Sequence, residues 1–504
     1  MNIENNKWLT LFSTGIMILL VNLDMTIINL ALPEISAYFK ANMNQAQWII
    51  ASYLLATTLS FIVFGRLADH WGHKKIFLFG TILFTLSSLV AGLSKHLSIL
   101  LLARFFQGLG FAATLGLSIV LIVDAFPEHQ KGTAAGTGIT ISGLAQAIGP
   151  TLGGIILQYA HWQWVFLINV PLGILSCLMT AKFVRPDQKK FTRSLPFSAT
   201  NAALFTLSLA IVLVMINQWN VFNGKIIAFS LLLGAGMLVF FIRDCHKNSR
   251  ALLDLSLLAN RNFVYIVFLR FCFMILMASM LFILPLYLQN ILNYSAFDAG
   301  LILLAMTCVI AVSSPIVGKL LDEVSFVWPL IISLIFALCS TLLMLFFTAD
   351  ISFVLLITTL LLFGLAIGFH VSSSMNGALT QTPKEKSGTA VGLFFTLAIA
   401  GATIGVALSG ILVNTLSHRF LTQLITQENM QLSSEQLINL FRVAEGTANI
   451  RSIGLNNAQI LYYRHCVYNA FMHALHVEMG LLSLLMLLAV VGSLGLRRRP
   501  QMCL

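Results

Sequence analysis

The sequence contains the stretch Pro127-Glu-His-Gln-Lys-Gly-Thr-Ala-Ala-Gly136 in two versions, because Pro383-Lys-Glu-Lys-Ser-Gly-Thr-Ala-Val-Gly392 repeats its pattern 256 residues later (383 − 127 = 256). Each copy lies between long apolar stretches. The same shift places further glycines in register: Gly108 with Gly364, Gly149 with Gly405, and Gly154 with Gly410. The repeat therefore covers two consecutive apolar segments and the loop between them, and it predicts a protein built from two duplicated halves.

Composition places the chain among membrane proteins. Of its 504 residues, 58% are hydrophobic and only 9% are charged, and the mean hydropathy is +0.91. Lipid is the main solvent of such a chain. The net charge of +11 does not indicate nucleic-acid binding, because the basic residues lie in short loops between apolar spans. The 7 cysteines are scattered singly, without the spacing of metal ligands or of a disulfide framework, so we expect no metal and no cofactor.

Apolar stretches of about 20 residues, the length that crosses a bilayer, predict an all-α polytopic membrane protein with 14 transmembrane helices. Residues 1–184 hold six of them, residues 185–260 hold two, and residues 261–504 hold the last six. We expect the first and last groups to form two pseudo-symmetric bundles, joined by a linker pair with basic cytoplasmic loops.

Basic residues mark one side of this arrangement, at 182–193, at 243–261 and in the tail 497–499. Because lysine and arginine are enriched in cytoplasmic loops, both termini are expected in the cytoplasm, on a multi-pass protein of the plasma (inner) membrane. The long polar loop 415–466 is expected on the opposite side, and residues 433–436 predict the start of a short amphipathic helix within it.

Four stretches carry a resemblance to a known family: Leu23 to Pro33 (Leu-Asp-Met-Thr-Ile-Ile-Asn-Leu-Ala-Leu-Pro), Gly65 to Lys74 (Gly-Arg-Leu-Ala-Asp-His-Trp-Gly-His-Lys), Arg104 to Gly110 (Arg-Phe-Phe-Gln-Gly-Leu-Gly) and Gly149 to Gly154 (Gly-Pro-Thr-Leu-Gly-Gly). They resemble the signature motifs of the major facilitator superfamily, and with 14 spans the chain is similar to its fourteen-helix drug:proton antiporter branch. The resemblance implies multidrug efflux: export of amphipathic small molecules, antibiotics among them, in exchange for protons.

Asp24 is the candidate proton-coupling residue. It lies about sixteen residues into the first helix, which at about 1.5 Å per residue is well inside the hydrocarbon layer. An ionised carboxylate there is costly unless it is paired, protonated or hydrated, so its surroundings can switch its proton on or off. Arg104 in the fourth helix is the expected partner, in an electrostatic role, since arginine does not release its proton at neutral pH. The alternatives are an aspartate bonded to nearby backbone and an arginine that reaches the headgroups.

The loop between the second and third helices carries a candidate cytoplasmic gate formed by Gly65, Asp69, Gly72, His73 and Lys74. Its acid can pair with bases or stabilise a helix N-terminus. Histidines stand at positions 70 and 73, where the family usually has arginine or lysine, and histidine changes its charge near neutral pH. We therefore expect a pH-sensitive gate, with two solvated loop histidines as the alternative.

The fifth helix carries the motif Gly149, Pro150, Gly153 and Gly154. A proline disrupts a helix and small residues allow close backbone approach, so a bend is expected here. The resemblance implies that this motif forms a hinge or a seal, as is typical of antiporters that export their cargo. Helix packing alone also explains the small residues, and the second half has Val406 in place of the proline.

Four more polar residues are candidates for the central cavity: Asn29, Gln107, Arg270 and Glu478. Arg270 lies in the ninth helix, the equivalent of the first, where it would favour anionic or zwitterionic cargo; snorkelling and an ion pair are the alternatives. Glu478 lies in the fourteenth helix, and we expect a structural or interfacial acid there rather than a second proton site.

The sequence has no phosphate-binding Gly-x-x-x-x-Gly-Lys-Ser/Thr loop and no constellation of nucleophiles, so we expect an ion gradient as the energy source and no enzymatic activity. The expected partners are the lipid bilayer, protons and an amphipathic substrate. In a two-membrane bacterium the resemblance also allows a periplasmic adaptor and an outer-membrane channel. Two alternatives stay open: a dedicated exporter of one endogenous metabolite, siderophore or lipid, and a non-transporting sensor or assembly component that binds a partner through loop 415–466.

Overall fold

The computed structural model describes residues 3–127, 130–185, 198–219, 222–247, 252, 255–382, 387–427, 440 and 457–496, and within these ranges the chain is helical without any strand. The first half contains α1 (Ile3–Phe39), α2 (Met43–Trp71), α3 (His73–Gly92), α4 (Leu97–Ala125), α5 (Lys131–Tyr159), α6 (Trp164–Leu167) and α7 (Asn169–Phe183). Two linking helices follow, α8 (Ala199–Asn217) and α9 (Gly224–Lys247), and then the short 3-10 helix η2 (Leu255–Ala259). The second half contains α10 (Arg261–Leu286), the short π-helix η3 (Tyr287–Ile291), α11 (Ala296–Glu323), α12 (Val327–Met344), α13 (Phe353–Thr380), α14 (Ser387–Gln427) and α16 (Asn457–Ser493).

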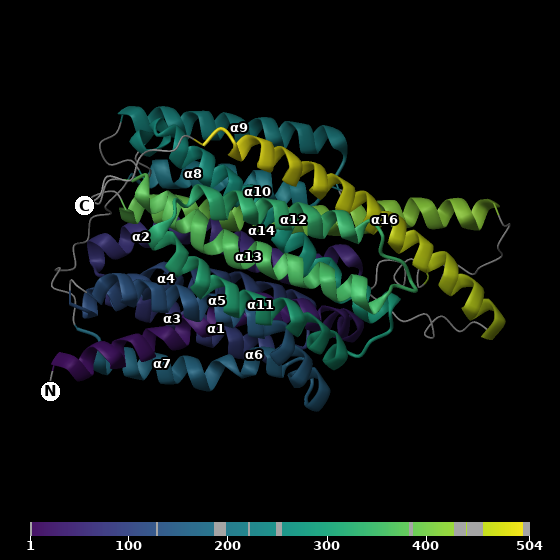
Figure 1. The fold of residues 1–504 in the computed structure, drawn as a ribbon, viewed down its shortest axis with the longest axis horizontal. Helices are drawn as coiled ribbons and strands as arrows, with labels where there is room; N and C mark the ends of the chain where they lie inside the picture. Colours follow the sequence, from purple (N-terminus) through teal and green to yellow (C-terminus); the bar gives the residue numbers. More distant parts are fainter. Residues whose placement is uncertain are drawn as a thin grey trace.

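Thirteen helical segments of the described residues are long and apolar enough to cross a membrane, with α6 and α7 counted as one span over Trp164–Phe183. α5, with 29 residues, is a further long helix, which packs against α1 and α11. α1 begins and α16 ends at the same end of the elongated bundle (Figure 1), as an even number of crossings requires. The predicted all-α polytopic membrane fold is therefore confirmed.

Side-chain caps define where several helices begin. At the start of α2 the Asn42 side chain accepts from the Gln45 backbone N–H, and the Gln45 side chain accepts from the Asn42 backbone N–H. At the start of α11 the Ser295 side chain accepts from the Asp298 backbone N–H, and Asn260 caps α10. These polar residues satisfy backbone N–H groups that the first helical turn leaves without a partner. The chain thus turns sharply at membrane-surface positions and re-enters the bundle.

The duplication is visible in the packing of equivalent helices. A Cβ on Gly364 of α13 would lie 2.6 Å from the Met306 carbonyl oxygen of α11. Its equivalent, Gly108 of α4, lies just as closely against the Tyr53 carbonyl of α2. Only glycine permits this backbone-to-backbone approach between neighbouring helices. The matched glycines therefore fix the same helix pair in each half, α2 with α4 and α11 with α13.

The two halves contact one another mainly through two equivalent helix pairs, α5 with α11 and α14 with α2. On α5, a Cβ at Gly154 would lie 2.8 Å from the Ala296 carbonyl oxygen at the start of α11. On α14, the equivalent Gly410 packs directly on the Gln47 side chain of α2. Each half thus inserts the same glycine of its fifth helix against the other half. The linking helices α8 and α9 pack on each other and expose many large apolar side chains, as helices facing lipid do.

Some helix ends differ from those expected. α14 continues to Gln427 and α16 begins at Asn457, so helix extends into both ends of the segment 415–466, and both helices reach beyond the other helices at the end of the bundle away from the start of α1 (Figure 1). The amphipathic helix predicted from 433–436 lies outside the described residues. The last of the six spans expected within residues 1–184 is divided at Ile168 into α6 and α7.

Candidate functional site: a buried ion pair on α1 and α4

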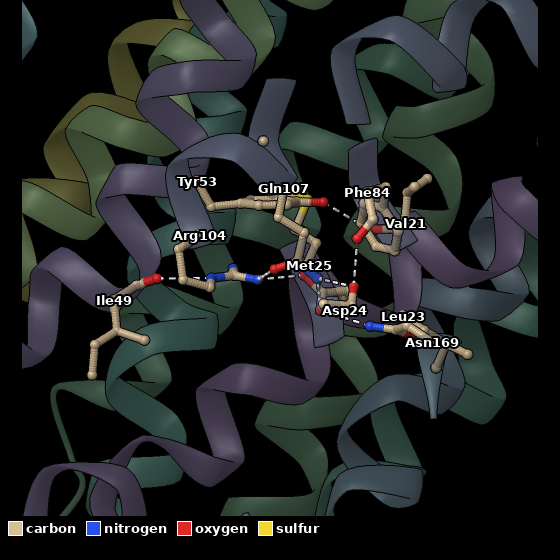
Figure 2. Close-up of polar contacts among 12 residues, drawn as sticks. Val21, Leu23, Asp24, Met25, Ile49, Tyr53, Phe84, Arg104, Gln107 and Asn169 are labelled. Carbon is tan, nitrogen blue, oxygen red and sulfur yellow. Dashed lines mark hydrogen bonds and ion pairs between the residues drawn. The ribbon is translucent and has the colours of Figure 1, made fainter. Parts of the chain in front are cut away.

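Asp24 and Arg104 form an ion pair in the interior of the first half. The Arg104 Nη1 atom lies 2.5 Å from Asp24 Oδ2, and both side chains are completely enclosed. Asp24 lies just after the midpoint of α1. Arg104 lies two turns after the start of α4, at the same level of the bundle. Figure 2 shows the two side chains pointing toward one another between α1 and α4. The structure thus brings together the two residues that the sequence singles out for proton coupling.

Gln107 extends the pair into a network. Its Nε2 atom donates to Asp24 Oδ1 at 2.9 Å and to the Ser88 hydroxyl of α3 at 2.8 Å. Its Oε1 atom accepts from Arg104 Nη1 at 2.8 Å. Gln107 is one turn after Arg104 on α4, so a single helix face supplies both groups. The glutamine therefore fixes the relative position of the acid and the base.

Asn169 supplies a third donor to the carboxylate. Its Nδ2 atom lies 3.1 Å from Asp24 Oδ1, and the residue stands at the first position of α7, directly after the break between α6 and α7 (Figure 2). Reasoning from the sequence missed this contact. A buried asparagine at a helix break is the signal that could have found it, because such a side chain needs a hydrogen-bond partner.

Arg104 is held on its other side as well. Its Nε atom donates to the Ile49 carbonyl at 3.0 Å, and the guanidinium carbon lies 4.2 Å from the centre of the Tyr53 ring. The Tyr53 hydroxyl in turn donates to the Val21 carbonyl of α1 at 3.2 Å. Ring, carbonyl and carboxylate together compensate the buried positive charge. Arg104 is therefore anchored within the bundle and does not reach for the headgroups.

The hydrogen bonds to the Asp24 carboxyl indicate which of its protonation states fits this geometry. All three described side chains that contact the Asp24 carboxyl, those of Arg104, Gln107 and Asn169, present N–H donors to it. A carboxylate accepts such bonds with both oxygens, whereas a protonated carboxyl would place its own O–H against donors. The arrangement therefore fits an ionised Asp24.

The α5 motif packs directly on the helix that carries Asp24. Gly149 lies against the Thr26 side chain, and a Cβ on Gly153 would lie 2.8 Å from Ile27 Cγ1. Thr151, on the same stretch, donates its hydroxyl to the Gly300 carbonyl of α11 at 3.2 Å. α5 is one helix through Pro150, from Lys131 to Tyr159. The motif thus connects the Asp24 helix with the second half of the protein.

The gate motif lies at the junction of α2 and α3. Gly72 has a φ of 108°, a backbone conformation that suits glycine, and it ends α2 and begins α3. Lys74 donates to the carbonyls of Ala181 at 2.9 Å and Val184 at 2.7 Å, at the end of α7. His73 Nδ1 lies 3.9 Å from an Asp124 carboxylate oxygen of α4. A Cβ on Gly65 would meet no atom within 4 Å, and Asp69 lies in the last turn of α2.

The remaining candidates do not join the Asp24 network. Asn29 donates to the Met25 and Thr26 carbonyls of its own helix. Arg270 on α10 lies over the Phe394 ring of α14. Glu478 on α16 is fully buried and accepts a hydrogen bond from the Ser409 hydroxyl of α14. The first half thus contains a connected acid–base site, whereas the polar residues of the second half are separate from it.

A helical membrane protein made of two duplicated bundles, with an ion pair buried inside one of them, has the architecture of a secondary transporter. Residues 14–406 match the family model described as Major Facilitator Superfamily, and the chain belongs to this family. The match confirms the resemblance that the four sequence motifs predict.

Individual relatives cover most of the chain. The riboflavin transporter RibZ of Clostridioides difficile (strain 630) is 31% identical over 386 residues, which are 76% of this chain and 83% of that protein. The multidrug resistance protein Stp of Mycobacterium tuberculosis (strain ATCC 25618 / H37Rv) is 30% identical over 413 residues, 81% of this chain and 76% of that protein. Multidrug resistance protein 3 of Bacillus subtilis (strain 168) is 28% identical over 401 residues, 78% and 77% of the two chains.

Among solved structures, the crystal structure of a bacterial homolog to the human lysosomal transporter Spinster, in an inward-facing and unoccupied conformation, has a TM-score of 0.64 to this protein. The two chains are 15% identical, and the match covers 98% of this chain and 99% of the other. At this identity the likeness concerns the fold alone.

Proposed function

We propose that the protein is a proton-coupled antiporter of the cytoplasmic membrane, which exports amphipathic small molecules by alternating access and keeps both termini in the cytoplasm. The observation that carries this proposal is the Asp24–Arg104 pair, a fully enclosed acid and base in the middle of a membrane-spanning bundle. Ionisable residues at such a depth are costly and therefore mark ion pathways in transporters.

The hydrogen bonds around Asp24 supply a link between proton and conformation. Protonation removes the negative charge that holds Arg104 Nη1, and it gives the carboxyl a donor that faces the donors of Gln107 and Asn169. The protonated protein then favours a different arrangement of α1, α4 and α7. In an antiporter, the cargo stabilises one arrangement of the helices and the proton stabilises the other.

The α5 motif transmits this change to the second half. Thr26, two residues after Asp24, fills the space that Gly149 leaves free, and Gly154 packs on Ala296 of α11 five residues further along α5. A displacement of α1 therefore reaches the contact between the halves through one packed helix. At the other end of the bundle, the junction of α2 and α3 is held to the end of α7 by Lys74, and we assign this contact the role of a cytoplasmic latch.

The relatives support an exported small molecule as the cargo. Two of the relatives described above are named multidrug resistance proteins, which favours a tolerant site for amphipathic compounds. The relative named a riboflavin transporter favours the second candidate, a transporter dedicated to one metabolite. Substrate breadth separates the two: several unrelated compounds are transported in the first case and one compound in the second.

The test uses purified protein in liposomes with an acidic lumen and a panel of permanently charged cations, neutral drugs and organic acids. The proposal predicts that the pH gradient drives uptake of at least one compound, with proton release from the lumen, and that nigericin, which collapses the gradient, stops both. Empty liposomes report passive partition of each compound. Protein-dependent uptake that continues unchanged without a pH gradient would contradict proton antiport.

A further inference from the structure

Arg270 is a buried cation for which the described part of the protein supplies no anion. The side chain is 8% exposed, and its Nε and Nη1 atoms are enclosed without any hydrogen-bond partner. Among the described residues, no carboxylate lies within ion-pair distance of it. The contact that does stabilise the charge is the Phe394 ring, whose centre lies 5.6 Å from the guanidinium carbon.

Arg104, the other described arginine that is buried in a membrane-spanning helix, shows which partners such a side chain usually has. Arg104 has a carboxylate at 2.5 Å, a glutamine oxygen at 2.8 Å and a backbone carbonyl at 3.0 Å. Arg270 lies nine residues after Arg261 on α10, roughly 14 Å along the helix, yet no described residue gives its Nε or Nη1 atom such a partner. A membrane interior gives an unpaired guanidinium little solvation, so such a group is expected to bind an anion.

A second polar group with unused hydrogen-bonding capacity lies beside it. His370 of α13 is fully buried, its ring stacks on Phe273 at 3.8 Å, and its Nε2 atom has no partner. Phe273 follows Arg270 by one turn of α10, so the imidazole lies next to the turn that carries Arg270. The Ser333 hydroxyl donates to the Leu330 carbonyl at 2.6 Å, so the 3.0 Å contact between Ser333 and His370 Nδ1 uses the imidazole N–H. The neutral ring then presents Nε2 as a free hydrogen-bond acceptor, which can receive a bond from a donor group of a bound molecule.

The unpaired guanidinium lies near the boundary between the halves. Phe394, over which it lies, is followed on α14 by Phe395, and Phe395 stacks on Phe61 of α2 with ring centres 5.3 Å apart. α14 and α2 form one of the two most extensive helix contacts between the halves. Transporters with duplicated halves hold their cargo at this boundary. The charge is therefore close to the boundary at which transporters of this architecture hold their cargo.

We propose that Arg270 forms an anion subsite in the second half, which binds the carboxylate, sulfonate or phosphate group of an amphipathic cargo, with His370 Nε2 as an acceptor for a donor group of the same molecule. The Phe394 and Phe273 rings that flank the pair supply apolar contact surface for the rest of the molecule. The inference rests on the proposed function and narrows its cargo to amphipathic anions and zwitterions. An anionic lipid headgroup offers the same chemistry, so the test includes a lipid arm.

The experiment measures binding of fluorescent pyrenebutyrate, its methyl ester and a trimethylammonium analogue to the protein in nanodiscs of phosphatidylcholine, without any gradient. Wild type is compared with Arg270→Gln, Arg270→Lys and the control Arg261→Gln, which removes one exposed positive charge from the same helix. We expect the acid to bind wild type at least tenfold more tightly than the ester. Arg270→Gln should lose this preference without weakening ester binding, Arg270→Lys should keep part of it, and Arg261→Gln should keep all of it.

Equal binding of acid and ester to wild type would overturn the subsite, as would an equal loss of all three ligands in Arg270→Gln. Binding of the acid that disappears when a quarter of the lipid is phosphatidylglycerol would assign the site to lipid and also overturn the cargo proposal. Thermal unfolding gives an independent check: Arg270→Gln should melt at or above the wild-type temperature, and a lower melting temperature would mean that the guanidinium has a structural partner. The binding experiment uses no gradient. A negative result would therefore overturn the anion subsite without bearing on proton antiport, which the liposome experiment tests separately.

Discussion

Gly149 of α5 accommodates the side chain of Thr26 of α1, so that the α5 motif and the helix of Asp24 are in direct backbone-level contact. Any side chain on Gly149 would overlap the Thr26 hydroxyl. On the opposite side of the same motif, Gly154 makes the equivalent contact with α11. The ionisable pair and the contact between the halves are therefore connected through a few residues of α5.

Gly149→Ala should impair transport more than it impairs folding. The added methyl group must displace α1 or α5, and overpacking of this kind costs roughly 1–3 kcal/mol of stability. Gly143→Ala is the matched control, since a Cβ at Gly143 on the same helix would meet no atom within 4 Å. We expect at least a tenfold loss of proton-driven transport for Gly149→Ala and near wild-type transport for Gly143→Ala, measured in liposomes. Equal transport by the two variants would show that the contact with α1 is not part of the coupling path.

Asp24 and Arg104 should be coupled in stability. Asp24→Asn leaves the Arg104 guanidinium enclosed without its carboxylate, and Arg104→Gln leaves the carboxylate without its cation. Removing one member of a buried pair typically costs about 3–5 kcal/mol. The double variant leaves neither charge unpaired, so it should be clearly more stable than the sum of the single losses predicts. Thermal unfolding of the four proteins in the same detergent measures this, and strictly additive losses would contradict the pairing.

The contact between Thr151 and Gly300 should open during each cycle. Under the proposed orientation it lies at the outer end of the bundle, where the Gln289 side chain also donates to the Leu30 carbonyl across the halves. Cysteines at positions 151 and 300, in a protein without native cysteines, should form a cross-link that stops transport, and a reducing agent should restore it. Thr151→Cys alone serves as the control for the substitution. Full transport by the cross-linked protein would show that these two residues stay together throughout the cycle.

Glu478 should be dispensable for coupling. It is fully buried between α14 and α16, it hydrogen-bonds to the Ser409 hydroxyl, and no cation among the described residues pairs with it. A neutral amide can replace the carboxyl in such a place. We therefore expect Glu478→Gln to retain proton-driven transport within about threefold of wild type, in the liposome assay used for Gly149→Ala. A loss as large as that of Asp24→Asn would instead identify a second proton site.

The sequence repeat and the charged residues within apolar segments made the two-bundle fold and the Asp24–Arg104 pair predictable. The 256-residue shift places Gly108 and Gly364, and Gly149 and Gly405, in contacts with equivalent helices, because the same small residue is needed wherever two backbones meet. The pairing of Asp24 with Arg104 follows from the cost of leaving either charge alone in lipid. The boundaries at 184 and 260 between bundles and linker stay predictions.

Other features have no local signature. Asn169 reaches Asp24 across 145 residues of chain, and its position depends on the break between α6 and α7. That no described carboxylate pairs with Arg270 depends on the side chains that neighbouring helices place around it, which hydropathy does not report. The extension of α14 to Gln427 exceeds the length that a bilayer requires, so a count of apolar residues ends the helix too early.

Substrate-induced proton release is the most direct measurement of the central claim, that Asp24 exchanges its proton for cargo. Purified protein in weakly buffered detergent is mixed with a compound found to be transported, over a series of starting pH values, and a pH indicator follows the solution. The account predicts that wild type releases protons in proportion to protein and that Asp24→Asn binds the compound without releasing any. Equal proton release from Asp24→Asn would contradict the account, because the exchanged proton would then reside elsewhere.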